Sequence, residues 1–228
     1  MGGRLPRVPG TLANDERTMI HTSTLQDDSF IGGNYFDKYR SKNPIHRMLM
    51  SQFLSSARNM ISEIDFESIL EVGCGPGDLA EELFKSDANY LGIDIDDREI
   101  MTARARYPHR KFQHASAYEL PIENVSIDLV VACEVLEHLS DPEAAMTELD
   151  RVARKWILLS VPREPLWRIL NFARGKYWWD LGNTPGHLQH FSRRDFLKLI
   201  ESRWFVLKGK SPVPWTMALA CKRAPCKN

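Results

Sequence analysis

The segment 68–80, which reads S-I-L-E-V-G-C-G-P-G-D-L-A, limits most strongly what this chain can fold into. A short apolar run is followed by Gly73, Gly75 and Gly77, and a helical pattern begins at Asp78. An apolar run of this length that ends in glycines is typical of a buried parallel strand entering a tight turn. Glycine permits positive φ and close approach of a ligand, and the first N–H groups of the next helix face the turn. The segment therefore predicts a nucleotide-binding turn.

The composition is that of an ordinary globular protein. The chain has 228 residues, of which 43% are hydrophobic and 26% charged, and this suits one α/β domain with a sizeable core. Its 30 basic and 30 acidic residues give a formal net charge of zero, which does not favour a nucleic-acid partner. The sequence has no apolar run long enough to span a membrane and no signal-peptide pattern. Its 4 cysteines lack a zinc or redox spacing, so we expect free thiols and a cytoplasmic location.

Strand and helix patterns alternate along much of the chain. Helical patterns lie between the early strand patterns, which is typical of parallel strands joined by crossover helices. A short proline-containing turn joins the last two strands. We therefore expect an α/β fold with a doubly wound, mostly parallel seven-stranded sheet and a C-terminal antiparallel hairpin. The runs that predict the strands are 69–72, 89–94, 111–115, 127–133, 155–161, 204–209 and 213–222.

The domain organisation follows from the same patterns. Residues 1–28 show no periodicity, and we expect a mobile N-terminal arm. Residues 29–228 then form a single domain, because no internal repeat or low-complexity segment indicates a second one. Within it, residues 29–64 contain an aromatic segment and an amphipathic helix. Residues 162–191 are too long for a bare connection between secondary-structure elements and indicate an insertion.

The carboxylates near the glycine turn indicate which kind of ligand it binds. Asp94 ends the second predicted strand, 23 residues beyond Glu71, and an acid at about 20 residues after such a turn accepts hydrogen bonds from ribose hydroxyls. The dinucleotide fingerprint G-x-G-x-x-G needs a small residue where this chain has Asp78. A pyrophosphate is unfavourable beside Glu71 and Asp78, whereas a cationic ligand is not. A cationic nucleoside is therefore favoured, and a nucleotide-dependent oxidoreductase is the alternative.

With Glu71 two residues before Gly73, the segment resembles the first motif, E/D-x-G-x-G-x-G, of the class I S-adenosylmethionine (SAM)-dependent methyltransferases. The resemblance covers roughly residues 69–162 and extends more loosely to the C-terminus. It implies SAM as the cofactor, a lid formed by residues 29–64, and an acceptor-side position for the insertion at 162–191. The residues that it implies for the cofactor site are Glu71, Gly73, Gly75, Gly77, Asp94, Ile95, Ser116, Ala117 and Cys133.

The turn after the third predicted strand concerns the adenine base. In the resembling enzymes this turn reads D-A-x-x-L-P, and its Asp reaches the adenine amino group. Here it reads S-A-Y-E-L-P, so Ser116 offers a hydroxyl that can accept the bond but carries no charge. The resemblance also places Ile95 against the adenine ring. We expect the adenine contact from Ser116 or from the backbone of Ala117.

A second group of ionisable residues follows the fourth predicted strand. Glu134, Glu137 and His138 lie at the carboxyl edge of the sheet, where α/β proteins bind ligands. The pattern E-x-x-E-H resembles the metal motif of the ubiquinone-pathway O-methyltransferases and of the small-RNA 3′-terminal 2′-O-methyltransferases, which use a later histidine as well. It implies a divalent cation, Mg²⁺ or another, on these residues and His187, with His190 the other histidine nearby. The pattern also occurs in similar enzymes without metal, where His138 or His187 would serve as a base.

The insertion carries aromatic side chains interleaved with basic ones, among them Trp167, Arg168 and Trp178. Such a cover suits a small-molecule acceptor that is large and apolar or aromatic, and it leaves open contact with a membrane surface. We expect methyl transfer to a hydroxyl oxygen, because the fourth strand does not end in the N-P-P-Y pattern of enzymes that methylate amino groups of nucleobases or glutamine. A non-catalytic SAM-binding partner protein is a third alternative, and the sequence leaves the oligomeric state open.

Overall fold

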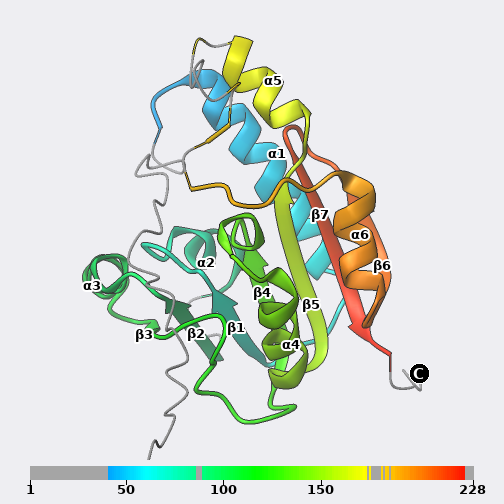
Figure 1. Cartoon of the computed structure of the whole chain (residues 1–228). Helices are drawn as coiled ribbons and strands as arrows, with labels where there is room; N and C mark the ends of the chain where they lie inside the picture. Colours follow the sequence, from blue (N-terminus) through cyan, green and yellow to red (C-terminus); the bar gives the residue numbers. More distant parts are fainter. Residues whose placement is uncertain are drawn as a thin grey trace, which may run out of the picture. The chain divides into compact units, whose positions relative to one another are not determined.

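The computed structural model describes residues 41–85, 89–173, 175, 181, 183–184 and 186–223 (Figure 1). The predicted arm at 1–28 and the aromatic part of the predicted lid lie outside these residues, as does Trp178 of the insertion. Within the described ranges, no helix has the length and apolar character needed to cross a membrane.

The predicted strands pair in one sheet. Along the chain they are β1 (Ser68–Val72), β2 (Asn89–Asp94), β3 (Lys111–His114), β4 (Ile127–Cys133), β5 (Ala153–Pro162), β6 (Trp204–Lys210) and β7 (Trp215–Lys222). Their order in the sheet is β3-β2-β1-β4-β5-β7-β6. β7 runs antiparallel to both β5 and β6, and the other neighbours are parallel. The mostly parallel seven-stranded α/β sheet with a C-terminal hairpin is therefore confirmed. The strand order reverses between β1 and β4, which places a ligand crevice at their carboxyl ends.

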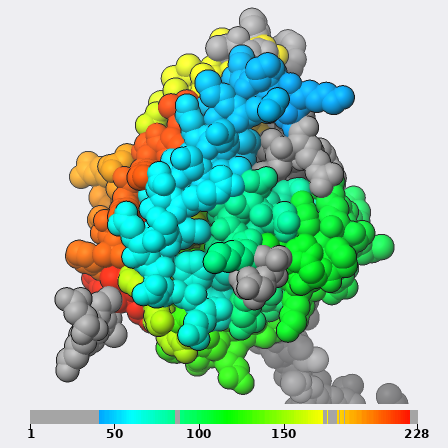
Figure 2. Space-filling view, turned by 180° about the vertical axis from the view of Figure 1, so that it is seen from behind, coloured from blue at the N-terminus to red at the C-terminus, as the bar shows by residue number. Residues whose placement is uncertain are grey.

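Helices cover both faces of the sheet, as a doubly wound fold requires. They are α1 (Pro44–Ile61), α2 (Asp78–Leu83), α3 (Asp97–Arg106), the short 3₁₀ helix η1 (Leu136–His138), α4 (Pro142–Val152), α5 (Leu166–Ala173) and α6 (Arg193–Glu201). α1, α2 and α3 pack on one face, and α4 and α6 pack on the other. Figure 2 shows the first face, much of which is covered by the blue and cyan residues of the α1 region.

Alternation of side chains along the strands supplies two hydrophobic cores. In β4, Leu129 and Val131 pack in the core with α1, whereas Val130 and Ala132 pack in the core with α4. Side chains two residues apart share one face of a strand, so a strand buried on both faces reads as a continuous apolar run. This is why the sequence of β4 is apolar almost throughout.

Capping residues set where α1 and α4 begin. Asn43 accepts the N–H of Ile45 at 2.9 Å, and proline occupies the first turn of α1. Asp141 accepts the N–H of Ala144 at 3.0 Å at the start of α4. α1 ends at Ile61, and Ile64, which continues the apolar pattern, packs on the core from outside the helix.

Candidate functional site

The glycine turn joins β1 to α2 at the carboxyl edge of the sheet. Gly73 has a φ of +72°, and a Cβ there would come within 2.3 Å of Cγ2 of Val135. Gly75 has a φ of +50°, and no described atom lies within 4 Å of an added Cβ. Gly77 is the N-cap of α2. The backbone therefore requires glycine at Gly73 and Gly75, and the open space beside Gly75 gives a ligand access to the chain.

Glu71 lies on β1 just before the turn and is only 2% exposed. Its Oε2 accepts a hydrogen bond from the hydroxyl of Tyr90 on β2 at 2.7 Å. Burial raises the pKa of Glu71 to about 8, because water no longer stabilises the carboxylate; the bond from Tyr90 acts in the opposite direction. A cation bound at the turn would favour the ionised form of Glu71. The sequence did not indicate Tyr90, although a tyrosine in a buried strand needs a partner for its hydroxyl.

Asp94 ends β2 and contacts the glycine turn directly. Its Oδ2 accepts the N–H of Gly75 at 2.8 Å, and its Oδ1 accepts the N–H of Asp96 at 2.9 Å. A carboxylate has about four acceptor positions, so a ligand hydroxyl can still bind beside these N–H groups. Burial raises the pKa of Asp94. The structure thus gives Asp94 a part in holding the turn, in addition to the predicted ribose contact. The carbonyl of Ile95, the next residue, lies 2.9 Å from Nε2 of His114.

Asp78 is buried at the start of α2, and its charge is compensated within the fold. Its Oδ2 lies 2.9 Å from Nη1 of Arg106, and its Oδ1 accepts the hydroxyl of Tyr107 at 2.6 Å. Both partners lie at the end of α3. Repulsion of a pyrophosphate by Asp78, which we expected from the sequence, is therefore not supported. The argument against a dinucleotide then depends on the glycine spacing, because the raised pKa of Glu71 leaves that carboxyl largely uncharged near neutral pH.

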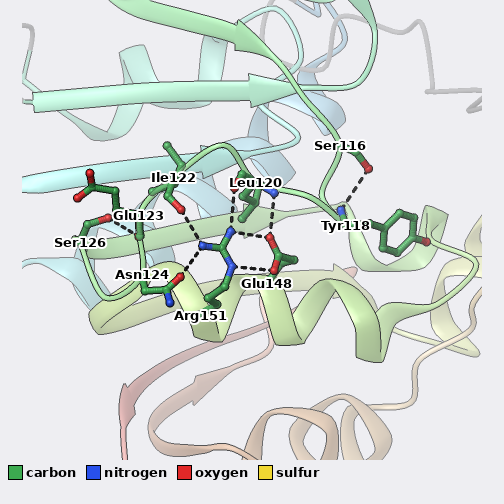
Figure 3. A network of polar contacts seen from close by, with 9 residues as sticks. All are labelled: Ser116, Tyr118, Leu120, Ile122, Glu123, Asn124, Ser126, Glu148 and Arg151. Carbon is green, nitrogen blue, oxygen red and sulfur yellow. Dashed lines mark hydrogen bonds and ion pairs between the residues drawn. The ribbon is translucent and has the colours of Figure 1, made fainter.

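The turn after β3 brings the predicted adenine residues Ser116 and Ala117 to the same edge. His114, the last residue of β3, is the register partner of Asp94, so this turn begins beside the end of β2. The hydroxyl of Ser116 accepts the N–H of Tyr118 at 3.2 Å (Figure 3). The nine predicted cofactor residues thus lie in or next to the carboxyl ends of β1, β2, β3 and β4.

Glu134 follows β4 in a left-handed conformation, with a φ of +62°. Its Oε1 accepts the hydroxyl of Ser160 on β5 at 3.2 Å, and its Oε2 accepts the indole N–H of Trp215 on β7 at 2.7 Å. These bonds hold a backbone conformation that is unfavourable for a non-glycine residue. They also direct the Glu134 carboxylate toward β5 and β7. Cys133, the preceding residue, is buried, and burial raises the pKa of its thiol.

The structure brings Glu137, His138 and His187 together, with one ligand atom from each within 4.8 Å of the others. Nε2 of His138 lies 3.9 Å from Oε1 of Glu137. Nδ1 of His138 lies 2.9 Å from the carbonyl oxygen of Gly186. Because a carbonyl oxygen only accepts, Nδ1 carries the proton, and Nε2 is the acceptor in the neutral ring. The group can therefore accept a proton or bind a cation. Glu134 is not one of its members.

Backbone bonds hold His187 against η1. The N–H groups of Leu188 and Gln189 both donate to the carbonyl of Glu137, at 2.8 and 2.9 Å. The ring of His187 lies edge-on to that of His138, with 5.0 Å between centroids. The indole of Trp167 stacks on His187, with centroids 6.0 Å apart and an interplanar angle of 27°.

Residues of α5 bind this segment from the other side. The indole N–H of Trp167 and the amide of Asn171 donate to the hydroxyl of Thr184, at 2.8 and 3.1 Å. The ring of Trp167 also lies 6.3 Å from that of Trp215. The sequence placed Trp167 in an aromatic cover but did not indicate Asn171, Thr184 or Trp215. The spacing of Trp167 and Asn171, one helical turn apart, was the available signal that they act together.

The chain is similar in sequence to known methyltransferases. Residues 70–156 match the family model described as a methyltransferase domain. Over 139 residues the chain is 31% identical to a probable S-adenosylmethionine-dependent methyltransferase of Mycolicibacterium smegmatis, with 60% of this chain and 51% of that protein covered. The match thus spans about half the length of that relative. The chain is also 25% identical over 233 residues to the ubiquinone biosynthesis O-methyltransferase of Roseobacter denitrificans, with 90% and 92% covered.

The fold is similar to that of solved methyltransferases. The crystal structure of magnesium protoporphyrin IX methyltransferase from Synechocystis PCC 6803, with bound SAH, superposes with a TM-score of 0.63. The superposed region covers 81% of this chain and 91% of that protein, and the two sequences are 17% identical. An identity this low shows a shared fold and carries nothing about the acceptor.

Proposed function

We propose, on the premise that this chain belongs to the SAM-dependent methyltransferases, that it transfers a methyl group to a hydroxyl oxygen of a small-molecule acceptor. The observation that supports this most is the position of the glycine turn and the histidine group at the ends of β1 and β4, which are neighbours in the sheet. A methyl donor and an acceptor bound at neighbouring strand ends can be held in line, and such positioning contributes much of the catalysis of a bimolecular transfer. The sequence similarity to methyltransferases favours methyl transfer over the alternative function, that of a nucleotide-dependent oxidoreductase.

The glycine turn and its carboxylates fit the cofactor. SAM, when bound, supplies an electrophilic methyl group on a sulfonium. The open side of Gly75 admits the nucleoside, and the remaining lone pairs of Asp94 would accept the ribose hydroxyls. Glu71, once ionised, would balance the positive charge of the ligand. The adenine would lie beside Ile95, Ser116 and Ala117.

His138 is the residue that we propose as the base. Its Nδ1–H donates to the carbonyl of Gly186, so Nε2 is the acceptor nitrogen of the neutral ring and would take the proton from the acceptor hydroxyl. The carboxylate of Glu137, 3.9 Å from that nitrogen, would stabilise the imidazolium that forms. His187 lies next to His138 and is the second candidate.

A divalent cation is a second proposal for the same group. The carboxylate of Glu137 and the two imidazoles offer oxygen and nitrogen ligands of the kind that Mg²⁺ or a transition metal binds. The bond from His138 to Gly186 orients Nε2 as such bonds do in metal-binding histidines. A bound cation would lower the pKa of the acceptor hydroxyl. Glu134 is bonded to β5 and β7, so we propose the set without it.

Calorimetric titration with Mn²⁺ tests the cation. We expect Glu137→Gln to abolish binding, because it removes the charged ligand. Glu134→Gln is the matched control and should retain binding, because its carboxylate lies outside the group. Loss of Mn²⁺ binding in both variants would favour the predicted set of four ligands, which includes Glu134. A wild-type protein that does not bind Mn²⁺ would leave His138 as a base without metal.

The aromatic side chains beside the histidine group favour a large apolar or aromatic acceptor. The indoles of Trp167 and Trp215 lie next to the histidine group and give flat apolar surface. The roles of residues 29–64 as a lid and 162–191 as an acceptor-side insertion, the cytoplasmic location and any membrane-surface contact stay predictions.

Titration with S-adenosylhomocysteine (SAH) and with NAD, each with Mg²⁺ and with EDTA, tests the proposed function. Micromolar binding of SAH without binding of NAD is the expected result. Binding of NAD would favour the oxidoreductase. Binding of SAH that is followed by no methylation of any phenol or alcohol in a broad acceptor panel would favour a non-catalytic SAM-binding protein.

A further inference from the structure

Arg151 on α4 binds the segment that follows the predicted adenine turn (Figure 3). Its Nη2 donates to the carbonyl of Leu120 at 2.8 Å, and its Nη1 donates to the carbonyl of Ile122 at 2.7 Å and to Oδ1 of Asn124 at 2.8 Å. Its Nε and Nη2 donate to the two carboxylate oxygens of Glu148, at 2.8 and 2.7 Å. The guanidinium has five N–H groups, and this arrangement uses all of them.

Glu148 completes the contact with Leu120. Its Oε2 accepts the N–H of Leu120 at 2.9 Å, so the pair on α4 binds both backbone polar groups of that residue. The side chain of Leu120 is only 3% exposed and packs in the core with α4. Leu120 is therefore fixed in both its backbone and its side chain.

The turn itself lies directly before this fixed point. Tyr118 donates its N–H to the hydroxyl of Ser116, and its own hydroxyl accepts the N–H of Asp141 at 3.1 Å and lies 3.1 Å from Oγ of Ser140. The turn is thus tied to the start of α4 through Tyr118 and to the body of α4 through Leu120. Both ties come from α4 and the residues that lead into it, so the position of the turn depends on α4.

We propose that the pair Glu148–Arg151 is a positioning element for the adenine of the cofactor. It holds the turn so that the hydroxyl of Ser116 and the N–H of Ala117 meet the amino edge of the base. Neither member of the pair touches the cofactor. The inference rests on the proposed function, because it needs an adenine-containing ligand at the turn.

The arrangement requires arginine rather than only a positive charge. Two carbonyls, one amide oxygen and a carboxylate are bound at once by a planar group with fixed N–H directions. Lysine has three donors around a single point and cannot bind these acceptors together. Arg151→Lys therefore keeps the charge and removes the geometry.

The affinities for SAH and S-inosylhomocysteine, measured by calorimetry, test the proposal. Inosine carries a carbonyl oxygen and a ring N–H where adenine carries an amino group and a ring acceptor, so the ratio of the two dissociation constants reports contact with the amino edge. We expect Arg151→Lys to lower the preference for SAH by about tenfold, the loss of one well-formed hydrogen bond. The affinity for S-inosylhomocysteine should change much less.

Arg154→Lys is the matched control. Arg154 also pairs with a buried carboxylate, that of Asp128, at 2.7 Å, but at the amino end of β4 and β5. It should leave the preference for SAH unchanged even if the melting temperature falls. An unchanged preference in Arg151→Lys, or an equal drop in both variants, would overturn the proposal.

Hydrogen exchange of the Tyr118 amide in the ligand-free protein separates this inference from the proposed function. Faster exchange in Arg151→Lys than in Arg154→Lys is expected, because the segment after the turn loses the bonds that Arg151 makes to it from α4. Equal exchange in both would overturn the positioning role. A wild-type protein that does not bind SAH would overturn the proposed function and, with it, the assignment of the turn to adenine.

Discussion

The proposed cofactor half of the site and the proposed acceptor half are built by different means. In the cofactor half, the bonds from Gly75 to Asp94 and from Tyr90 to Glu71 each join residues 19 positions apart in the chain. In the acceptor half, Glu134 and Trp215 are 81 positions apart, and His138 and Gly186 are 48 apart. These two bonds of the first half lie within one strand–turn–helix unit and the neighbouring strand β2. The second half forms only when β4, β7 and the segment after α5 are all in place.

The difference implies that the two halves can be damaged separately. Changes in the cofactor half should alter SAM and SAH affinity, because its residues would contact the ligand or fix the glycine turn. Changes in the acceptor half should alter the rate of transfer, because its residues would orient the proposed base. The following predictions test that separation.

The largest effect is expected from His138→Ala. Loss of a general base lowers kcat by about 10²- to 10⁴-fold, while SAH affinity should stay near that of the wild-type protein. The measurement is methyl transfer from labelled SAM to whichever phenol of a panel the wild-type protein methylates. His187→Ala is the comparison variant, and a larger loss there would make His187 the base. Full activity in both variants would exclude histidine as the base.

The next effect is expected from Asp94→Ala. Removing a buried charge-assisted contact should weaken SAM and SAH binding at least tenfold, or about 1.5–3 kcal/mol. Calorimetry on the folded variant provides the measurement. Asp94→Asn keeps an oxygen for one of the two N–H groups and should lose less. An unchanged affinity in Asp94→Ala would remove Asp94 from the cofactor site.

Glu71 should make stability depend on pH. Its pKa rises from 4.5 in the unfolded chain to about 8 in the folded protein, so the folded state holds an extra proton between these values. Stability should therefore fall as pH rises through this window, by at most about 1.4 kcal/mol per pH unit. Denaturant unfolding of wild-type and Glu71→Gln proteins at several pH values measures the difference. Parallel pH profiles would contradict the raised pKa.

The smallest effect is expected from Trp215→Phe. This change keeps an aromatic ring and removes the indole N–H that binds Glu134, at a cost of about 1 kcal/mol in unfolding free energy. Transfer activity should fall while SAH affinity stays unchanged, because Trp215 packs against Trp167, which stacks on His187 of the histidine group. Reduced SAH affinity would show that the two halves are coupled.

The fold was largely predictable from local patterns. The apolar runs at β1, β2 and β4 and the glycines after β1 depend on residues close together in sequence, and the structure confirms the sheet that they predicted. Residue 64 shows the limit of such patterns, because an apolar side chain at helical spacing can also pack from the loop beyond the helix.

The site was predictable only in part. The sequence brought Glu137, His138 and His187 together by resemblance, and their side chains do lie close to one another. It could not show that Glu134 binds Ser160 and Trp215, or that Asp78 binds Arg106, because the choice of partner depends on how distant elements pack. A carboxylate beside a site can serve as a ligand or as an anchor, and only its neighbours distinguish the two.

The antiparallel direction of β7 determines which part of the C-terminal hairpin can influence the reaction. In a parallel strand the last residues reach the ligand edge, whereas in β7 the first residue, Trp215, pairs with Pro162 at the carboxyl end of β5. The turn between β6 and β7 therefore opens onto the acceptor half, far from the glycine turn in the sheet order. Exchanging that turn alone offers a route to new acceptor selectivity in which the methyl donor is bound as before.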